Sequence, residues 1–331
     1  MNKIMNEENK RSEEDAMPLV TFALFAYNQE QYIREAMEAA LAQTYENLEI
    51  IVSDDASPDK TFEIMQECVA EYNGAHKIIL NRNERNLGLA GHVNKVFEMS
   101  NGEIIVMAAG DDVSVPERVQ VIVEEFDVQA PNTMIVYSNG WRTDEHGAII
   151  EEVGNSFAVQ YPYDNNSMLH PILSVPGALM AWRCQLMTEF GPISIDNIAE
   201  DNVLTKRAML LGRIAYADKC LVQWRRLARS LTTDMRDHWH KSDVRERRLG
   251  SYKWDSIVAR QLVADLKATK NPYTDIIPLA ERQLAKSEFL YEQWTRPGSI
   301  WITIAAAIKL RSRGILSEYI RALIYHRRRR R

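Results

Sequence analysis

Between residues 18 and 138, short runs of apolar, β-branched residues alternate with stretches in which apolar positions recur every three or four residues. Strands that alternate with helices in this way are typical of βαβ units, whose strands run parallel in one sheet. We therefore expect an α/β domain with a mostly parallel central sheet and flanking helices. The pattern predicts strands at residues 19–27, 48–53, 77–81, 103–109 and 133–138, and helices at residues 30–42, 58–72, 89–99 and 116–126.

Two of these helices have a recognisable start. Ser57 is suited to cap the N-terminus of the second helix, with Pro58 as its first helical residue. We expect Pro116 to open the fourth helix in the same way.

The second half of the chain follows a different pattern. After residue 139 the alternation gives way to short strands, turns and a loop rich in Asn, Pro and Tyr at residues 161–176, which we expect to shape one wall of a cleft. From about residue 238 the pattern is helical, with amphipathic stretches at residues 258–267 and 276–291. We predict a disordered tail at residues 1–17, an α/β domain at residues 18–235 and a helical C-terminal region at residues 236–331.

Composition excludes several classes of protein. The chain has 331 residues, of which 46% are hydrophobic and 26% charged, so disordered and low-complexity classes fit poorly. Its three cysteines form no CxxC pair, which argues against a disulfide framework or a zinc site and favours a reducing cytoplasm. Residues 1–17 lack the apolar stretch of a secretory signal. The apolar residues 300–308 are roughly half of the ~20 that a membrane-spanning helix needs, so we expect no membrane span.

The charge of the chain is unevenly distributed. From Arg296 to Arg331 there are ten Lys or Arg against Glu318 alone, a balance of +9, whereas the whole chain carries −6, so residues 1–295 carry −15. A basic end of this kind is attracted to anionic lipid headgroups by ~1 kcal/mol per cation. A solvated helix end, where cations suit the helix dipole, explains the same residues. In the membrane interpretation, electrostatics rather than insertion holds the chain, and high salt releases it.

Acidic pairs follow two of the predicted strands. Asp54-Asp55 come after the second strand and Asp111-Asp112 after the fourth; since adjacent residues point to opposite faces, each pair should divide its duties. In a parallel sheet, ligands bind beyond the carboxyl ends of the strands, and carboxylates there suit Mg²⁺ or Mn²⁺ held together with substrate phosphates. Gly110 allows a ligand to approach the backbone because it lacks a Cβ. The pattern points to a nucleoside diphosphate, although acids after strands also cap helices or stabilise turns.

A third acidic pair, Glu200-Asp201, precedes an apolar-periodic stretch that Gly212 closes. Carboxylates at the start of a helix often only complement the helix dipole. In the chemical interpretation, Asp201 is a general base that removes a proton from an attacking hydroxyl. The residues alone leave both interpretations open.

Several of these residues belong to motifs that together resemble family 2 glycosyltransferases. The resemblance is close over residues 18–126 and looser to residue 232, and it does not cover the helical C-terminal third. It implies the GT-A fold, which is Rossmann-like, together with a nucleotide-sugar donor, a divalent metal and an inverting transfer. The motifs, in order, are AYNQEQYI at residues 26–33, AQTY at 42–45, DDASPDKT at 54–61, NLG at 86–88 and GDD at 110–112.

The resemblance assigns residues to the nucleotide of the donor. Tyr27 would stack on the base, and Asp55 would hydrogen-bond that base. Asn28 and Glu30 belong to the same motif as Tyr27 and would lie near the nucleotide, and Asp111 would contact the ribose. A simpler explanation for Tyr27 is that it closes the strand against its neighbours, as aromatic residues often do.

The resemblance also assigns the residues of the chemical step. Asp112 would bind the metal that bridges the diphosphate, which leaves readily only while its developing charge is neutralised. Asp201 matches the Glu-Asp motif of the family and would activate the acceptor hydroxyl for in-line attack on the anomeric carbon. Arg225 lies in a segment that resembles the loop closing over the diphosphate, although a basic surface loop is an equally simple explanation. That segment comprises Trp224-Arg225-Arg226 with Ser230 and Thr232.

Two positions depart from the family pattern. Many relatives carry an Asp two positions before Asp111, where this chain has Ala109, so metal binding would depend more heavily on Asp112. The closing loop often carries a His where this chain has Leu227, which puts its phosphate contact in doubt.

The leading hypothesis is an inverting glycosyltransferase that adds a sugar, from a UDP- or dTDP-sugar, to a saccharide or lipid-linked acceptor in surface polysaccharide biosynthesis. We expect it in the cytoplasm, held peripherally at the inner face of the plasma membrane, with no nucleic acid partner. The main alternative is a non-catalytic GT-A protein that binds a nucleotide sugar or a partner. A phospho-receiver domain is much shorter than this chain. A nucleotidyltransferase usually has a Gly-rich phosphate loop near its start, where this chain has the AYNQEQYI motif. The amphipathic C-terminal helices fit a homo-oligomer contact as well as an intramolecular cap.

Overall fold

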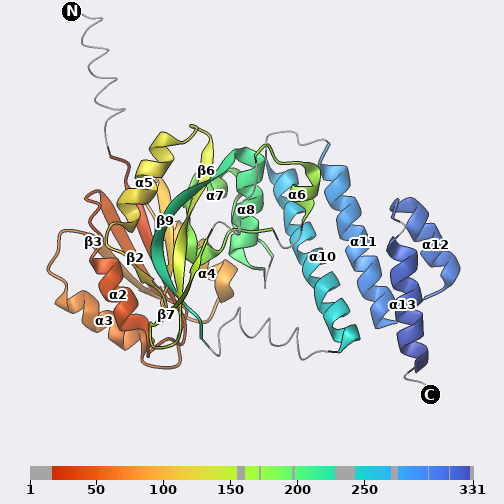
Figure 1. The fold of residues 1–331 in the computed structure, drawn as a ribbon, viewed down its shortest axis with the longest axis horizontal. Helices are drawn as coiled ribbons and strands as arrows, with labels where there is room; N and C mark the ends of the chain where they lie inside the picture. Colours follow the sequence, from red (N-terminus) through yellow and green to blue (C-terminus); the bar gives the residue numbers. More distant parts are fainter. Residues whose placement is uncertain are drawn as a thin grey trace, which may run out of the picture.

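The computed structural model of the chain describes residues 17–154, 161–170, 173–195, 198–227, 243–269, 275–296, 298–312 and 314–328. A twisted sheet flanked by helices forms one end of the molecule, and a row of long helices extends from it to the other end (Figure 1). Within residues 1–17 of the predicted tail, only Met17 is among the described residues. The predicted domain boundary near residue 235 also lies outside them.

The central sheet is mostly parallel, as the sequence predicts. Strands β3, β2, β1 and β4 lie side by side in that order and run parallel, and β9 runs parallel to β6. Strand β8 joins β4 to β6 in antiparallel pairing on both sides, while β5 and β7 pair antiparallel with β9 and β6. The strands are β1 (Val20–Ala26), β2 (Leu48–Asp54), β3 (Lys77–Arg82), β4 (Ile104–Ala109), β5 (Val113–Ser114), β6 (Thr133–Thr143), β7 (Ile149–Val153), β8 (Met180–Arg183) and β9 (Arg213–Arg225).

Helices cover both faces of the sheet. Alternate residues of a strand point to opposite faces, so Phe22 and Leu24 of β1 pack with α2, α3 and α5, whereas Ala23 and Phe25 pack with α4, α7 and α8. Burying one large apolar side chain stabilises a fold by about 1.5–3 kcal/mol, so these two layers hold the sheet between them. The helices are α2 (Ile33–Leu41), α3 (Thr61–Glu71), α4 (Gly88–Met99), α5 (Arg118–Val128), α6 (Asn165–Leu169), the 3₁₀ turn η1 (Gly177–Leu179), α7 (Gln185–Phe190) and α8 (Glu200–Leu211).

Two predicted helix starts are wrong. Helix α3 begins at Thr61, and Ser57 caps nothing; its hydroxyl donates to Asp54 and accepts a hydrogen bond from the Asn28 backbone N–H at 2.8 Å. The Ser57 hydroxyl donates to the Asp54 carboxylate because a hydrogen bond to a charged acceptor is stronger than one to a neutral acceptor. Pro116 lies two residues before α5, which begins at Arg118.

The second half of the sheet is larger than the sequence pattern indicates. Strand β6 continues to Thr143, beyond the predicted end at residue 138, and pairs with the 13-residue strand β9, which the pattern does not predict. Irregular register between β6 and β9 interrupts the apolar alternation that reveals a strand. The predicted loop at residues 161–176 contains the short helix α6, whose N-terminus Asp164 caps.

The predicted C-terminal helices are present. Helix α10 packs beside α8, and α11, α13 and α12 follow toward the end of the molecule opposite the sheet (Figure 1). Among the described helices, none combines the length and the hydropathy that crossing a bilayer requires. The helices are α10 (Val244–Ala268), α11 (Ile277–Thr295), α12 (Ile300–Lys309) and α13 (Gly314–Arg328).

Candidate active site

The fold brings the two predicted acidic pairs to the same edge of the sheet. The Asp55 backbone N–H donates to the carbonyl of Ala26, the last residue of β1, at 2.9 Å. The Gly110 backbone N–H donates to the carbonyl of Phe25 at 2.8 Å, from the opposite side of β1. Since neighbouring strands lie about 4.8 Å apart, Asp55 and the Gly110-Asp111-Asp112 segment flank the same strand end.

The members of the first pair have different partners, as expected. Asp54 is fully buried, accepts from the Ser57 N–H at 3.0 Å and lies 3.4 Å from Arg82 Nε, so its role is structural. The Asp55 carboxylate accepts from Asn83 Nδ2 at 2.8 Å and from two backbone N–H groups at the start of α4, at 2.9 and 3.0 Å. Asp55 thus anchors the segment between β3 and α4. A carboxylate can accept about four hydrogen bonds. These three donors therefore leave one acceptor site of Asp55 for a ligand.

The segment after β1 contributes a solvent-facing aromatic ring. Tyr27 is 48% exposed, which argues against the simpler interpretation that it closes the strand. Asn28 has a positive φ of 56°. Glu30 accepts from the Lys60 N–H at 3.1 Å, and its own N–H donates to Asp59 at 3.0 Å. Asn28 and Glu30 therefore fix this segment against the loop before α3 and leave Tyr27 at the strand edge.

Asp111 and Asp112 form a pair of carboxylates in which Asp112 is buried and Asp111 is half-buried. Burial raises the pKa of Asp112 well above its usual range, and the neighbouring charge of Asp111 raises it further. Burial also raises the pKa of Asp111, against a hydrogen bond from Gln29 and the charge of Arg225. The Asp112 Oδ1 atom accepts from the Arg225 backbone N–H at 2.8 Å. A bound cation would reduce the electrostatic repulsion between these two carboxylates.

These oxygens fit a hard divalent cation as a partial ligand set. The described residues contain no group of three or more His, Cys, Asp or Glu side chains that could hold a metal. Mg²⁺ usually takes one or two protein carboxylates and completes its shell with substrate phosphates and water. The pair at Asp111 and Asp112 matches that pattern.

Two arginines accompany Asp112. Arg118 is fully buried and donates to Ser114 Oγ and to the Ala178 carbonyl, both at 2.9 Å. Burial lowers its pKa to about 10, and the charge of Asp112 acts in the opposite direction. Because Arg118 still titrates above neutral pH, it is a cation beside Asp112.

Arg225 directs its side chain elsewhere. Its Nη2 lies 2.6 Å from Glu35 Oε2, and its guanidinium stacks over the Tyr32 ring at 4.7 Å. Its buried Nε has no hydrogen-bond partner within the part of the chain that the structure describes. Trp224 and Arg225 are the last residues of β9 rather than members of a loop, and Ser230 and Thr232 lie outside the described residues.

The third acidic pair opens α8. Burial raises the pKa of Glu200 to about 8, assisted by the charge of Asp201, and raises the pKa of Asp201 to about 6. Glu200 Oε2 is buried with no hydrogen-bond partner among the described residues. A Cβ on Gly177 would lie 2.6 Å from Glu200 Oε1, 3.8 Å from the Asp201 Cβ and 3.7 Å from Met107 Cε of β4. The turn at Gly177 therefore lies between the start of α8 and the strand that leads to Asp111 and Asp112.

Sequence reasoning missed two residues of this site and gave Glu200 no role in it. A Cβ on Gly110 would lie 2.5 Å from Gln29 Oε1, so the glycine admits Gln29, which hydrogen-bonds Asp111. Gln29 belongs to the AYNQEQYI motif, but the motif does not link it to Asp111. Arg118 does give one, since a cation in the first turn of a helix opposes the dipole and needs a nearby carboxylate.

Comparison with known proteins relates the first half of the chain to one family. Residues 21–180 match the model of "Glycosyl transferase family 2". EpsE of Bacillus subtilis, itself named only provisionally as a glycosyltransferase, is 36% identical over 103 residues. That match covers 31% of this chain and 36% of EpsE, so the chain spans about a third of this relative's length.

Two solved structures share the fold. S. aureus TarS 1–349 in complex with UDP-GlcNAc superposes with a TM-score of 0.55 at 18% identity, covering 92% of this chain and 79% of that one. The mannosyltransferase PcManGT of Pyrobaculum calidifontis, in complex with GDP-Man and Mn²⁺, superposes with a TM-score of 0.51 at 19% identity, covering 94% and 87%. The α/β architecture is thus a GT-A fold with C-terminal helices. The chain shares the fold of these structures, and its residues 21–180, 160 of 331, match the glycosyl transferase family 2 model.

Proposed function

We propose that the chain is an inverting glycosyltransferase that moves a sugar from a nucleoside-diphosphate sugar to a hydroxyl of a saccharide or lipid-linked acceptor in surface polysaccharide biosynthesis. The proposal is supported mainly by Asp55 and the Asp111-Asp112 pair, which flank the end of β1, and by Gly177, which lies close to both the Asp201 end of α8 and Met107 of β4. Acids from separate elements at one such edge suit a nucleotide, its diphosphate and an incoming hydroxyl.

The exposed end of β1 would receive the nucleotide. Tyr27 stacks on the base, and the remaining acceptor site of Asp55 takes a base N–H. Asp111 accepts from the ribose, while Asn28 and Glu30 keep the segment in place through their hydrogen bonds to the loop before α3. A base with an N–H facing a carboxylate is consistent with a UDP- or dTDP-sugar.

Asp112 would hold the divalent cation, Mg²⁺ or Mn²⁺, against the diphosphate. When bound, the cation neutralises the charge that develops on the leaving diphosphate. The Arg225 backbone N–H orients the Asp112 carboxylate, and the charge of Arg118 favours its ionised form. The Mn²⁺ complex of the PcManGT fold relative supports the choice of metal.

Asp201 would act as the general base. It takes the proton of the acceptor hydroxyl as that oxygen bonds to the anomeric carbon and the bond from this carbon to the diphosphate oxygen breaks. Attack from the face opposite the leaving group inverts the anomeric configuration. The Asp201 pKa of about 6 leaves it ionised at neutral pH, yet basic enough to accept the proton. Glu200, with a pKa of about 8, keeps its proton there and adds no second negative charge.

The location of the enzyme follows from the same proposal. A nucleotide-sugar donor is a cytoplasmic metabolite, and the basic C-terminal end would hold the enzyme at the inner face of the plasma membrane. The exposed C-terminal helices also leave room for a homo-oligomer.

The proposed function predicts the stereochemistry of the product. Incubation with UDP-, dTDP- and GDP-sugars, Mn²⁺ and simple glycosides should release nucleoside diphosphate, and proton NMR of the product should show the anomeric configuration opposite to that of the donor. A product that retains the configuration would contradict the in-line attack. If the chain binds the nucleotide sugar but releases no nucleoside diphosphate, neither by transfer to an acceptor nor by hydrolysis, the result would favour the non-catalytic alternative.

A further inference from the structure

The outer face of α12 is apolar and exposed. Trp301 is 76% exposed and Ile308 is 73% exposed, whereas Thr303 and Ala307 are buried against the neighbouring helices. Residues spaced by three, four and seven positions share one side of a helix, so Trp301, Ala305 and Ile308 form one face opposite Thr303 and Ala307. Ile302, 59% exposed, flanks this face. We call these four residues (Trp301, Ile302, Ala305 and Ile308) the α12 face.

The place of α12 in the fold sets this face apart from the sheet. The helix lies with α13 at the end of the molecule opposite the sheet (Figure 1). Large apolar side chains gathered on a protein surface commonly mark a contact with a membrane or a partner. Helix α12 has ten residues, so its length suits a position in the interface rather than across a bilayer.

The charges around the α12 face indicate its occupant. Lys309 and Arg311 are exposed at the C-terminal end of the helix. No acidic residue occurs from Arg296 to Ser317, and residues 296–331 carry +9 against −15 for the rest of the chain. An exposed Trp and isoleucines beside cations are the composition of helices that lie in the headgroup region of anionic membranes.

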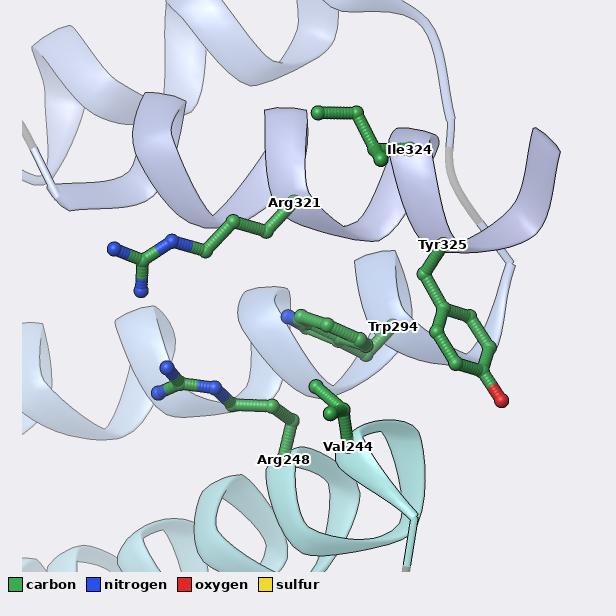
Figure 2. A pocket seen from close by; sticks show the side chains of 6 residues that line it. All are labelled: Val244, Arg248, Trp294, Arg321, Ile324 and Tyr325. Atoms are coloured by element: carbon green, nitrogen blue, oxygen red, sulfur yellow. The ribbon is translucent and has the colours of Figure 1, made fainter. Parts of the chain in front are cut away.

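A second candidate surface, on α10, α11 and α13, does not have this role. Arg248 and Arg321 line a pocket with Val244, Trp294, Ile324 and Tyr325 (Figure 2). The buried Glu318 carboxylate lies 2.7 Å from Arg321 Nη1 and 3.7 Å from Arg248 Nε, and it accepts from Trp294 Nε1 at 3.3 Å. Glu318 thus offsets the charge of both arginines. Lys309 and Arg311, by contrast, are exposed beside the α12 face.

We propose that the α12 face inserts into the headgroup region of an anionic bilayer. Trp301 and Ile308 enter the apolar boundary, while Lys309 and Arg311 lie against the lipid phosphates. This contact deepens the proposed membrane location: apolar insertion adds to the electrostatic attraction, so high salt weakens the contact without abolishing it. Because α12 lies at the end opposite the sheet, it tethers the enzyme without using the candidate active site.

Vesicle co-sedimentation of the full chain tests the proposal. Phosphatidylcholine vesicles are compared with vesicles that also contain phosphatidylglycerol, at about 0.1 M and about 0.5 M NaCl. The wild-type chain should bind the anionic vesicles at both salt concentrations. Trp301→Ser/Ile308→Ser should lower the partition coefficient by about tenfold or more at both. The matched control is Ile149→Ser/Ile150→Ser, which removes two exposed isoleucines from β7 and should bind as the wild type does.

Three results would overturn the proposal. One is equal vesicle binding by Trp301→Ser/Ile308→Ser and the wild type. Another is complete release of the wild type at the higher salt, which would leave electrostatics alone. The third is a dimer contact at the α12 face. In that case size-exclusion chromatography with light scattering would show a dimeric wild type and a monomeric Trp301→Ser/Ile308→Ser variant, and neither protein would bind vesicles. Since no donor or acceptor is present, these results are independent of whether the chain transfers a sugar.

Discussion

Asp201→Asn is expected to lower kcat by about 10²- to 10⁴-fold, because the amide cannot take the proton of the acceptor hydroxyl. The side chain keeps its size and its place in the first turn of α8, so donor binding should be retained. Release of nucleoside diphosphate at saturating donor measures kcat. Titration of the donor by calorimetry separates lost chemistry from lost binding.

Glu200→Gln is the matched control for this prediction. The Glu200 carboxyl, with a pKa of about 8, already carries a proton at neutral pH, and an amide resembles that neutral form. Its kcat should stay within about tenfold of the wild type, far above that of Asp201→Asn. Equal losses in the two variants would indicate that the pair only stabilises the start of α8 and would remove Asp201 from its catalytic role.

Arg207→Met is expected to lower the free energy of unfolding by about 3–5 kcal/mol, since it leaves the Asp265 carboxylate buried without its cation. Arg207 on α8 meets Asp265 on α10 in a bidentate ion pair, with nitrogen–oxygen distances of 3.0 and 2.8 Å. Both side chains are almost completely buried. The pair joins the C-terminal helices to the sheet domain. Chemical denaturation followed by circular dichroism measures the change.

Helix α10, which carries Asp265, also provides a control for the Arg207 prediction. Arg260 on α10 pairs with Glu288 on α11 at 2.6 Å, but both side chains are about half exposed. Arg260→Met should therefore change stability by only about 0–1 kcal/mol. Replacing both buried partners, as Arg207→Met/Asp265→Leu, should recover much of the loss because no unpaired charge remains. If Arg207→Met costs no more than Arg260→Met, α10 is held to the sheet domain by other contacts.

Local sequence pattern is sufficient to predict the first half of the fold. Strands β1 to β4 are short, continuous apolar runs separated by periodic helices, and parallel topology then requires the residues after each strand to meet at one edge. For this reason the sequence predicts that Asp55 and Asp112, 57 positions apart, lie in the same site. The alternation that reveals such strands is a property of neighbouring residues.

Contacts between distant segments could not be predicted in this way. The hydrogen bond from the Arg225 backbone to Asp112 joins residues 113 positions apart and depends on β9, whose irregular register conceals it in the sequence. The Arg207–Asp265 pair spans 58 positions and leaves no local trace. The α12 face is visible in the sequence as an apolar run, but its exposure depends on which helices pack around it.

Binding of nucleoside diphosphates with and without Mn²⁺ tests the central claim most directly. A ligand at 100 times its Kd stabilises the native state by about 2.7 kcal/mol, so Mn²⁺ should raise the melting temperature of the wild-type chain further when UDP or dTDP is present. Asp112→Asn keeps an oxygen acceptor for the Arg225 N–H but loses the charge that holds the cation, and it should lose the Mn²⁺-dependent increase. The same increase in both proteins would contradict the assignment of the metal to Asp112 and the account of the site built on it.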